Sequence, residues 1–152
     1  MKALITSRGK TPDGKWVYGY YAVHHIADTD NHAVLQGYTE SHAIFNDEDK
    51  HKSYWTDVIP DSVGHYTGKT DDSKKGKPIF SGDIVSCRSC RVDTTLGQKK
   101  LGLIEYDEES ASFVIKTADR VAQLGSSSLD AAICVIGNKI DSPKLYTKII
   151  HQ

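Results

Sequence analysis

The chain has 152 residues, which is enough for one domain, or for one domain with an appendage. Its composition of 38% hydrophobic and 26% charged residues is that of a globular protein. Nineteen Lys and Arg residues against twenty Asp and Glu residues give a net charge of -1. This balance argues against a mainly electrostatic nucleic-acid binder, although it leaves room for a local basic patch.

No stretch approaches the roughly 18 apolar residues of a membrane span. The opening MKALITSRGK lacks the apolar core of a signal peptide. Three cysteines, an odd number, fit a reducing compartment better than a disulfide framework. We therefore expect a cytoplasmic protein with no membrane contact.

Near the amino end, residues 4–7 and 16–26 are predicted strands, and the second is rich in β-forming side chains. A type I turn at 11–14, with Pro12 in its second position, joins them. Gly19 interrupts the second strand and predicts a bulge or a close backbone approach. Residues 28–52 are interpreted as a polar excursion holding one or two short strands, one of them at 33–38, or a helical turn.

The rest of the chain shows short apolar runs separated by turn residues, and the charged run 70–76 is predicted to be a solvated turn. Residues 117–130 fit either a short helix ending at Gly125 or a strand and a loop. At the tail, Ser142 is a candidate cap for a helix that begins at Pro143. The predicted strands here are 54–59, 62–67, 84–92, 101–106, 112–116 and 131–135.

These elements predict a mainly β protein, either a small bent sheet or an SH3-like barrel, with a short C-terminal helix. The predicted domains are residues 1–55, with the N-terminal strands and the polar excursion, and residues 56–152, the β-rich core with the helix. A single domain over 1–152 is the alternative.

Four segments occur in a characteristic order: DGKWVYGYY, VIPDSVGHYTGKTD…GKPIFSGDIV, GLIEYDEESASFVI and VIGNKIDSPKL. Together they resemble the YopX family, small proteins encoded by phages and prophages of bacteria. The opening of the chain matches this family loosely, and 87–100 and 119–130 do not follow a known pattern. The resemblance implies an accessory protein without catalytic residues that forms homo-oligomers. Its core signature comprises 66–68, 76–77, 79–80, 82–85 and 136–138.

The signature residues have a physical role in folding. Its glycines supply turn conformations that other residues resist, and Asp83 is expected to accept backbone hydrogen bonds that fix a turn. The signature is therefore interpreted as scaffold. The expected turn glycines are Gly68, Gly76 and Gly82, and the expected core residues are Ile79, Phe80, Ile84 and Val85.

The sharpest chemical motif is CRSC, Cys87 to Cys90. A structural zinc needs four ligands, so Cys134 and a histidine such as His24, His25 or His65 would have to join. We interpret the cysteines as ordinary thiols, with a metal site and a redox pair as less favoured alternatives. The seven histidines are scattered, and the carboxylates at 47–49 and 107–109 are typical of wet loops. We expect no catalytic residue, metal or cofactor.

Four aromatic residues within six positions are the candidate interaction site: Trp16, Tyr18, Tyr20 and Tyr21. On a strand the first three share one face and Tyr21 lies on the other. Packing into the core explains them as well; an exposed face would form an interface.

The first hypothesis for function is a non-enzymatic phage or prophage accessory protein that self-associates and binds a host or phage protein. The alternative is a nucleic-acid-binding small β-barrel whose lysines gather on one rim. A hydrolase or metal enzyme is the weakest hypothesis. The lysines of the alternative are Lys74, Lys75, Lys77, Lys99 and Lys100.

Overall fold

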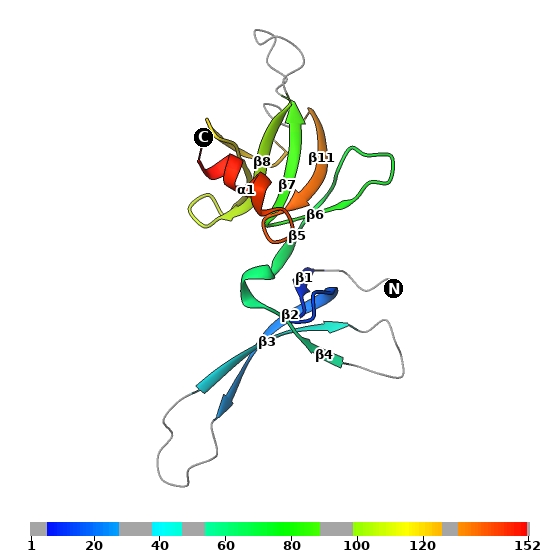
Figure 1. Cartoon of the computed structure of the whole chain (residues 1–152), viewed down its shortest axis with the longest axis vertical. Helices are drawn as coiled ribbons and strands as arrows, with labels where there is room; N and C mark the ends of the chain where they lie inside the picture. Colours follow the sequence, from blue (N-terminus) through cyan, green and yellow to red (C-terminus); the bar gives the residue numbers. More distant parts are fainter. Residues whose placement is uncertain (1–5, 28–37, 47–53, 89–98, 126–130, 152) are drawn as a thin grey trace. The chain divides into compact units, whose positions relative to one another are not determined.

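The computed structural model describes residues 6–27, 38–46, 54–88, 99–125 and 131–151. The chain divides into two compact units, which we call the N-terminal unit (Met1–His65) and the C-terminal unit (Tyr66–Gln152). Each unit has an antiparallel sheet, and β5 (Gly64–Thr70) begins in the first unit and continues in the second. The prediction of a mainly β protein with a short C-terminal helix is confirmed (Figure 1). The sheets are not closed, so the bent-sheet form holds and the barrel form is wrong.

The N-terminal unit is a sheet with the strand order β4-β3-β2-β1, continued by the start of β5. The predicted turn at 11–14 is present, because the Gly14 N–H donates to the Thr11 carbonyl at 2.9 Å. The predicted strand at 16–26 is confirmed as the long β2. The bounds are β1 (Ser7–Lys10), β2 (Trp16–Ala27), β3 (Tyr38–Asn46), β4 (Tyr54–Asp57) and a 3-10 turn (Pro60–Ser62).

The main difference from prediction is β3. Its nine residues fall in the stretch interpreted as a polar excursion, yet β3 is paired along both edges, to β2 and to β4. Of the predicted strand at 33–38, only Tyr38 lies among the described residues. The core of this unit is small. Ile44 is fully buried, and Val58 packs so closely on Gly9 that a β-carbon there would lie 2.8 Å from Val58 Cγ1.

The C-terminal unit has a sheet with the order β10-β9-β8-β7-β11, to which the β5–β6 hairpin is added. The predicted strand at 112–116 is confirmed, and residues 117–125, the described part of the segment left open between helix and strand, contain a short strand rather than a helix. The bounds are β6 (Pro78–Phe80), β7 (Asp83–Arg88), β8 (Lys100–Asp107), β9 (Ser112–Lys116), β10 (Val121–Gln123), β11 (Ala131–Asn138) and α1 (Pro143–Ile150).

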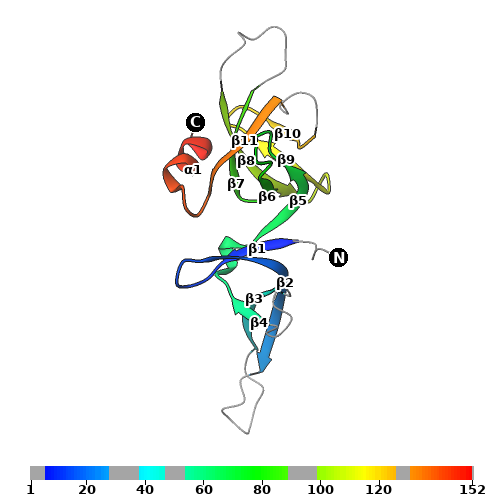
Figure 2. The ribbon, with the colours of Figure 1, turned by 90° about the vertical axis from the view of Figure 1, so that its right-hand side faces the viewer.

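This second sheet is covered on both sides. On one side Ile79 of β6 packs with five buried residues of the sheet: Val85, Cys87, Ile104, Ile115 and Ile133. On the other side Ile149 of α1 packs with Ile84 and Leu103. Figures 1 and 2 show α1 against the sheet within this unit. The four expected core residues are confirmed, since none is more than 3% exposed.

Local hydrogen bonds agree with the scaffold interpretation of the signature. Asp83 accepts the Phe80 N–H at 2.8 Å, and Gly68, Gly76 and Gly82 all have positive φ. Outside the signature, Ser142 stands at the predicted cap position of α1, but its side chain makes no capping hydrogen bond. Its carbonyl instead accepts the N–H groups of Leu145 and Tyr146.

Candidate functional site

A row of aromatic side chains crosses three neighbouring strands of the N-terminal unit. Tyr20 on β2 stands opposite Phe45 on β3, and Phe45 stands opposite Trp55 on β4. Opposite residues in antiparallel strands point to the same face of the sheet. The rings of Phe45 and Trp55 lie 5.1 Å apart, and the ring of His24 meets that of Trp55 edge-on at 4.6 Å. We call Tyr20, Phe45 and Trp55 the aromatic row.

The aromatic row is exposed. Trp55 is 50% exposed and Tyr20 is 44% exposed, and Tyr18, two positions before Tyr20 on the same strand, is 39% exposed. Tyr and Trp bring a large apolar area at low conformational cost, and they are enriched at protein interfaces. The row therefore has the chemistry of a contact surface.

The other two interface candidates lie differently. Trp16 is partly buried, with the guanidinium of Arg8 at 4.8 Å and the ammonium of Lys10 at 5.9 Å from its ring centre. Tyr21 points to the opposite face from Tyr20, where its hydroxyl hydrogen-bonds to His42 Nδ1 at 2.6 Å. The structure thus leaves Tyr18 and Tyr20 exposed and engages Trp16 and Tyr21 within the unit.

A polar cluster surrounds Tyr21. His42 Nε2 lies 3.7 Å from the Glu40 carboxylate, and the ring of His65 meets that of Tyr21 edge-on at 5.9 Å. Burial, and then the charge of Glu40, raise the pKa of Tyr21, so the phenol stays neutral at physiological pH. His65 Nδ1 is hydrogen-bonded to Ser7 Oγ at 3.0 Å, and Ser7 is buried, with only 3% of its surface exposed. These groups satisfy one another inside the unit.

Sequence reasoning missed Phe45 and Trp55 as members of the site. Trp55 fell in a predicted strand that gave no reason to place it on the surface. Phe45 fell in the supposed polar excursion. Only the pairing of β2, β3 and β4 places these two residues beside Tyr20. Register between strands is not encoded in the spacing of residues along one strand, so no local signal was available.

The comparisons with known proteins now bear on identity. The family model described as YopX protein matches residues 9–147. This chain belongs to the YopX family. No curated protein matches significantly. A solved structure, the crystal structure of protein EF1440 from Enterococcus faecalis, is similar at 18% identity with a TM-score of 0.45, covering 95% of this chain and 99% of that chain.

The lysines of the nucleic-acid alternative come from two segments of the C-terminal unit. Lys74, Lys75 and Lys77 are exposed on the segment between β5 and β6, which hydrogen-bonds to β11 through Asp71 and Asp72. The remaining two, at positions 99 and 100, lie at the start of β8, and β7 stands between β8 and β11 in the sheet. Their common rim stays a prediction.

The cysteine motif is only half described. Cys87 is fully buried and its thiol donates to the carbonyl of Lys100 at 3.7 Å, while Cys90 lies outside the described residues. Among the described residues, Cys87 and Cys134 form no disulfide. Within the described ranges, no three His, Cys, Asp or Glu side chains are grouped as metal ligands would be. Searched over the same ranges, no helix has the length and apolar character needed to span a membrane.

Proposed function

We propose that this YopX chain is a non-enzymatic phage or prophage accessory protein that self-associates through the aromatic row of its N-terminal unit. The observation that carries the proposal is the exposure of Trp55 and Tyr20, 50% and 44%, on one face of a sheet. The phage origin and the cytoplasmic location belong to the proposal and rest on what the family resemblance implies.

The small core of the N-terminal unit supports the proposal. Among its described residues only Ala43, Ile44 and Val58 are buried apolar side chains, whereas the described residues of the C-terminal unit include eleven. A unit of this size gains little stability from so few buried side chains, because burial must offset the entropy of ordering the chain. Covering the aromatic row with a second sheet would supply the missing apolar burial.

The surroundings of the row favour a protein partner over nucleic acid. Ala22 and Ala43 stand opposite each other on the same face, where Ala22 is partly exposed and Ala43 is buried. Asp57, two positions after Trp55, adds a negative charge to this face, and its carboxylate accepts the Ser41 hydroxyl at 3.3 Å. A nucleic-acid platform would combine stacking rings with positive charge. The cations of this sheet face, Arg8 and Lys10, lie over Trp16 on the β1 side rather than beside Phe45 and Trp55. A second copy of the same face, packed face to face, is the occupant we propose.

The test is the mass of the protein in solution, measured by light scattering during size-exclusion chromatography. We expect wild type to self-associate at about 10–100 μM. The double variant Trp55→Ala, Tyr20→Ala is expected to weaken the association at least about tenfold, because both exposed rings of the row are removed. Fluorescence of Trp16, which the variant retains, checks that the unit is folded.

Tyr106→Ala is the matched control. Tyr106 is also 50% exposed, but it lies on β8 of the C-terminal unit, against Phe113. We expect this variant to associate as wild type does. A wild-type monomer at about 100 μM, or a double variant that associates normally, would contradict the proposal. Binding of a labelled single-stranded oligonucleotide that is lost in the double variant would favour the nucleic-acid alternative instead.

A further inference from the structure

A short segment of the C-terminal unit, residues 71–77 between β5 and β6, carries three exposed lysines: Lys74, Lys75 and Lys77. We call this segment the lysine turn. Among the described residues, none of the three ammonium groups pairs with a carboxylate. The lysine turn belongs wholly to the second unit, so an inference about it does not depend on the proposed self-association.

Hydrogen bonds close the lysine turn and hold its backbone. The Asp71 N–H donates to the Lys77 carbonyl, and the Lys77 N–H donates to the Asp71 carboxylate, both at 2.8 Å. Between these ends, the Gly76 N–H donates to the Ser73 carbonyl at 2.9 Å. Because consecutive Cα atoms are about 3.8 Å apart, the Cα atoms of the three lysines lie within about 11 Å of one another. The three positive charges are thus held on one small surface.

The two carboxylates of the lysine turn bind the neighbouring strand rather than the lysines. Asp71 is buried and accepts the Val135 N–H at 3.0 Å, and Asp72 accepts the Ile133 N–H at 2.8 Å. Both donors belong to β11, which lies beside the turn in Figure 1. The carboxylates are therefore held on the β11 side, while the lysine side chains extend into water. An anion that approaches from water meets the ammonium groups.

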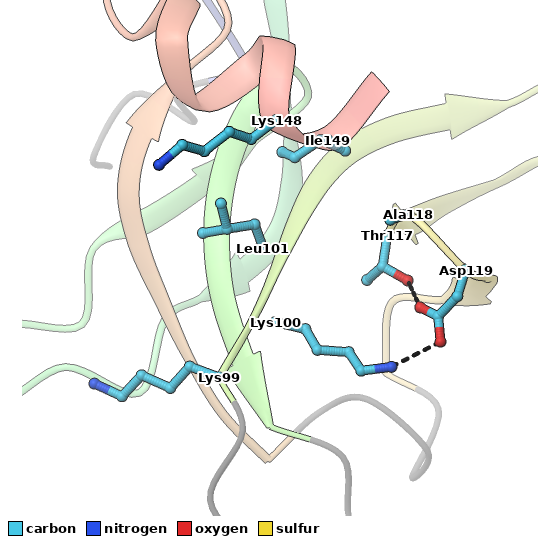
Figure 3. Close-up of a pocket in the computed structure, with 8 residues that line it drawn as sticks. All are labelled: Lys99, Lys100, Leu101, Thr117, Ala118, Asp119, Lys148 and Ile149. Atoms are coloured by element: carbon cyan, nitrogen blue, oxygen red, sulfur yellow. Dashed lines mark hydrogen bonds and ion pairs between the residues drawn. The ribbon is translucent and has the colours of Figure 1, made fainter. Parts of the chain in front are cut away.

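The other two lysines of the nucleic-acid alternative differ from those of the turn. In Figure 3 the side chain of Lys100 extends to Asp119, whose carboxylate lies 2.7 Å from the ammonium group. The same carboxylate accepts the Thr117 hydroxyl at 2.9 Å, which fixes its position. The charge of Lys100 is thus compensated within the protein, and Figure 3 shows Lys99 directed away from this pair. These two residues do not equal the cluster on the lysine turn.

We propose that the lysine turn binds the phosphate backbone of a nucleic acid without reading its sequence. Each strand of a duplex carries one phosphate per about 3.4 Å of helix axis, so a surface of this size can meet two or three phosphates. The lysine ammonium group is a point charge that suits phosphate oxygens. Contacts to phosphates position a protein on a nucleic acid but carry no sequence information.

The composition of the lysine turn argues against other anionic partners. The core of a protein interface is apolar and depleted in lysine, and a site at a membrane surface buries apolar side chains among the lipids. Residues 71–77 consist only of Asp, Ser, Lys and Gly, with no apolar side chain. Interfaces with nucleic acids are instead polar and strongly positive, which these lysines can supply.

The test is fluorescence anisotropy of a labelled single strand of about 12 nucleotides, and of its duplex, titrated with the full chain at several salt concentrations. We expect a Kd on the order of 10⁻⁴ M at about 50 mM salt. The logarithm of the association constant is expected to fall with that of the salt concentration, with a slope of about −2 for the strand and about −3 for the duplex, as three phosphate contacts require. The triple variant Lys74→Ala, Lys75→Ala, Lys77→Ala is expected to weaken binding at least about tenfold and to flatten the slope.

The matched control is the triple variant Lys99→Ala, Lys144→Ala, Lys148→Ala, which removes the same charge from three exposed lysines elsewhere in the same unit. We expect it to bind nearly as wild type does, and circular dichroism checks that both triple variants are folded. The variant Trp55→Ala, Tyr20→Ala keeps the lysine turn and is expected to bind with the same slope. The tests of the two proposals can therefore fail separately.

The proposal is overturned if neither oligonucleotide binds at about 1 mM protein and about 20 mM salt, or if the two triple variants lose binding equally. Polyglutamate of the same total charge serves as a competitor. If it displaces the oligonucleotide as well as an unlabelled strand does, the proposal is also overturned, because the turn would then have no preference for phosphate and an acidic protein would fit it equally.

Discussion

Replacing Asp71 with alanine is expected to lower the free energy of unfolding of the C-terminal unit by about 3–5 kcal/mol. Asp71 is only 5% exposed, and its carboxylate joins two distant parts of the chain. One oxygen accepts the backbone N–H of Lys77 at 2.8 Å and the hydroxyl of Ser73 at 2.6 Å. The other accepts the N–H of Val135 at 3.0 Å, on β11. Alanine would leave these donors without a partner at a buried site.

The measurement is denaturant unfolding followed by circular dichroism, together with hydrogen exchange of the Val135 amide. Exchange at Val135 is expected to accelerate in the variant, because its hydrogen bond to Asp71 is lost. Asp107→Ala is the control: Asp107 makes the same local pattern, accepting the N–H of Ser110 at 3.0 Å and its hydroxyl at 2.5 Å, but on an exposed hairpin. We expect the control to unfold nearly as wild type does. If both variants lose similar stability, Asp71 does not hold the segment between β5 and β6 against β11.

Because of the Asp71 carboxylate, part of the free energy of unfolding of the C-terminal unit is expected to depend on acid pH. Burial alone would raise the pKa of Asp71, but the hydrogen bonds from Ser73, Val135 and Lys77 outweigh it and hold the pKa below its ordinary 3.8. A group whose pKa is lower in the folded state stabilises fully above its unfolded pKa. That stabilisation is lost as the pH falls through the folded value. The stability gap between wild type and Asp71→Ala is therefore expected to be constant near neutrality and to narrow below about pH 3.8.

Asp71 also shows what sequence reasoning did not reach. The charged run 70–76 was predicted to be a solvated turn, and its lysines are indeed exposed. Asp71 within it is buried, so for this residue the prediction is wrong. Its partner Val135 lies 64 positions along the chain, and no local pattern announces a contact at that distance. A charged side chain is expected to be solvated, whereas the folded chain gives the Asp71 carboxylate backbone N–H donors in place of water.

The sequence was sufficient to predict those elements that depend only on neighbouring residues along the chain. The turn at 11–14, strand β2 and the core residues Ile84 and Val85 follow from turn residues and β-forming side chains, and all are present. Strand β3 was not predicted with these bounds because the polar residues Glu40 and Ser41 are adjacent and the buried residues Ala43 and Ile44 are adjacent, so no alternation marks a strand. It becomes a strand by pairing along both edges, which is a tertiary effect that overrides residue preference.

The candidate site divides in the same way. Alternation along β2 placed Tyr18 and Tyr20 on one face and Tyr21 on the other, as the structure has them. The members of the aromatic row from β3 and β4 depend on strand register, which the sequence does not specify locally.

Replacing Gly19 with alanine is expected to destabilise the N-terminal unit by about 3 kcal/mol or more. The sequence predicted a bulge or a close backbone approach at Gly19, and the close approach is confirmed. A β-carbon at Gly19 would overlap the carbonyl oxygen of Phe45 and lie 2.8 Å from its carbonyl carbon. Because the obstacle is backbone, no side-chain rotation relieves it, and β2 and β3 would have to separate locally.

Tryptophan fluorescence measures this unit selectively, because both tryptophans of the chain, Trp16 and Trp55, belong to it. The fluorescence transition of Gly19→Ala is expected at lower denaturant than that of wild type. Gly14→Ala is the matched control in the preceding turn. There a β-carbon would meet only the flexible end of Lys10 at 3.9 Å, so the cost is the left-handed backbone strain at φ +93°, about 1–2 kcal/mol.

The Gly19 variant also links the fold to the proposed function. Tyr20 follows Gly19 directly and stands opposite Phe45, so separating β2 from β3 at this point would break the aromatic row. Self-association is therefore expected to weaken together with stability in Gly19→Ala, whereas Trp55→Ala, Tyr20→Ala weakens association with the backbone pairing kept. A Gly19→Ala protein that unfolds and associates as wild type does would mean that β2 and β3 are not held at this close approach. The row would then not exist as a single surface.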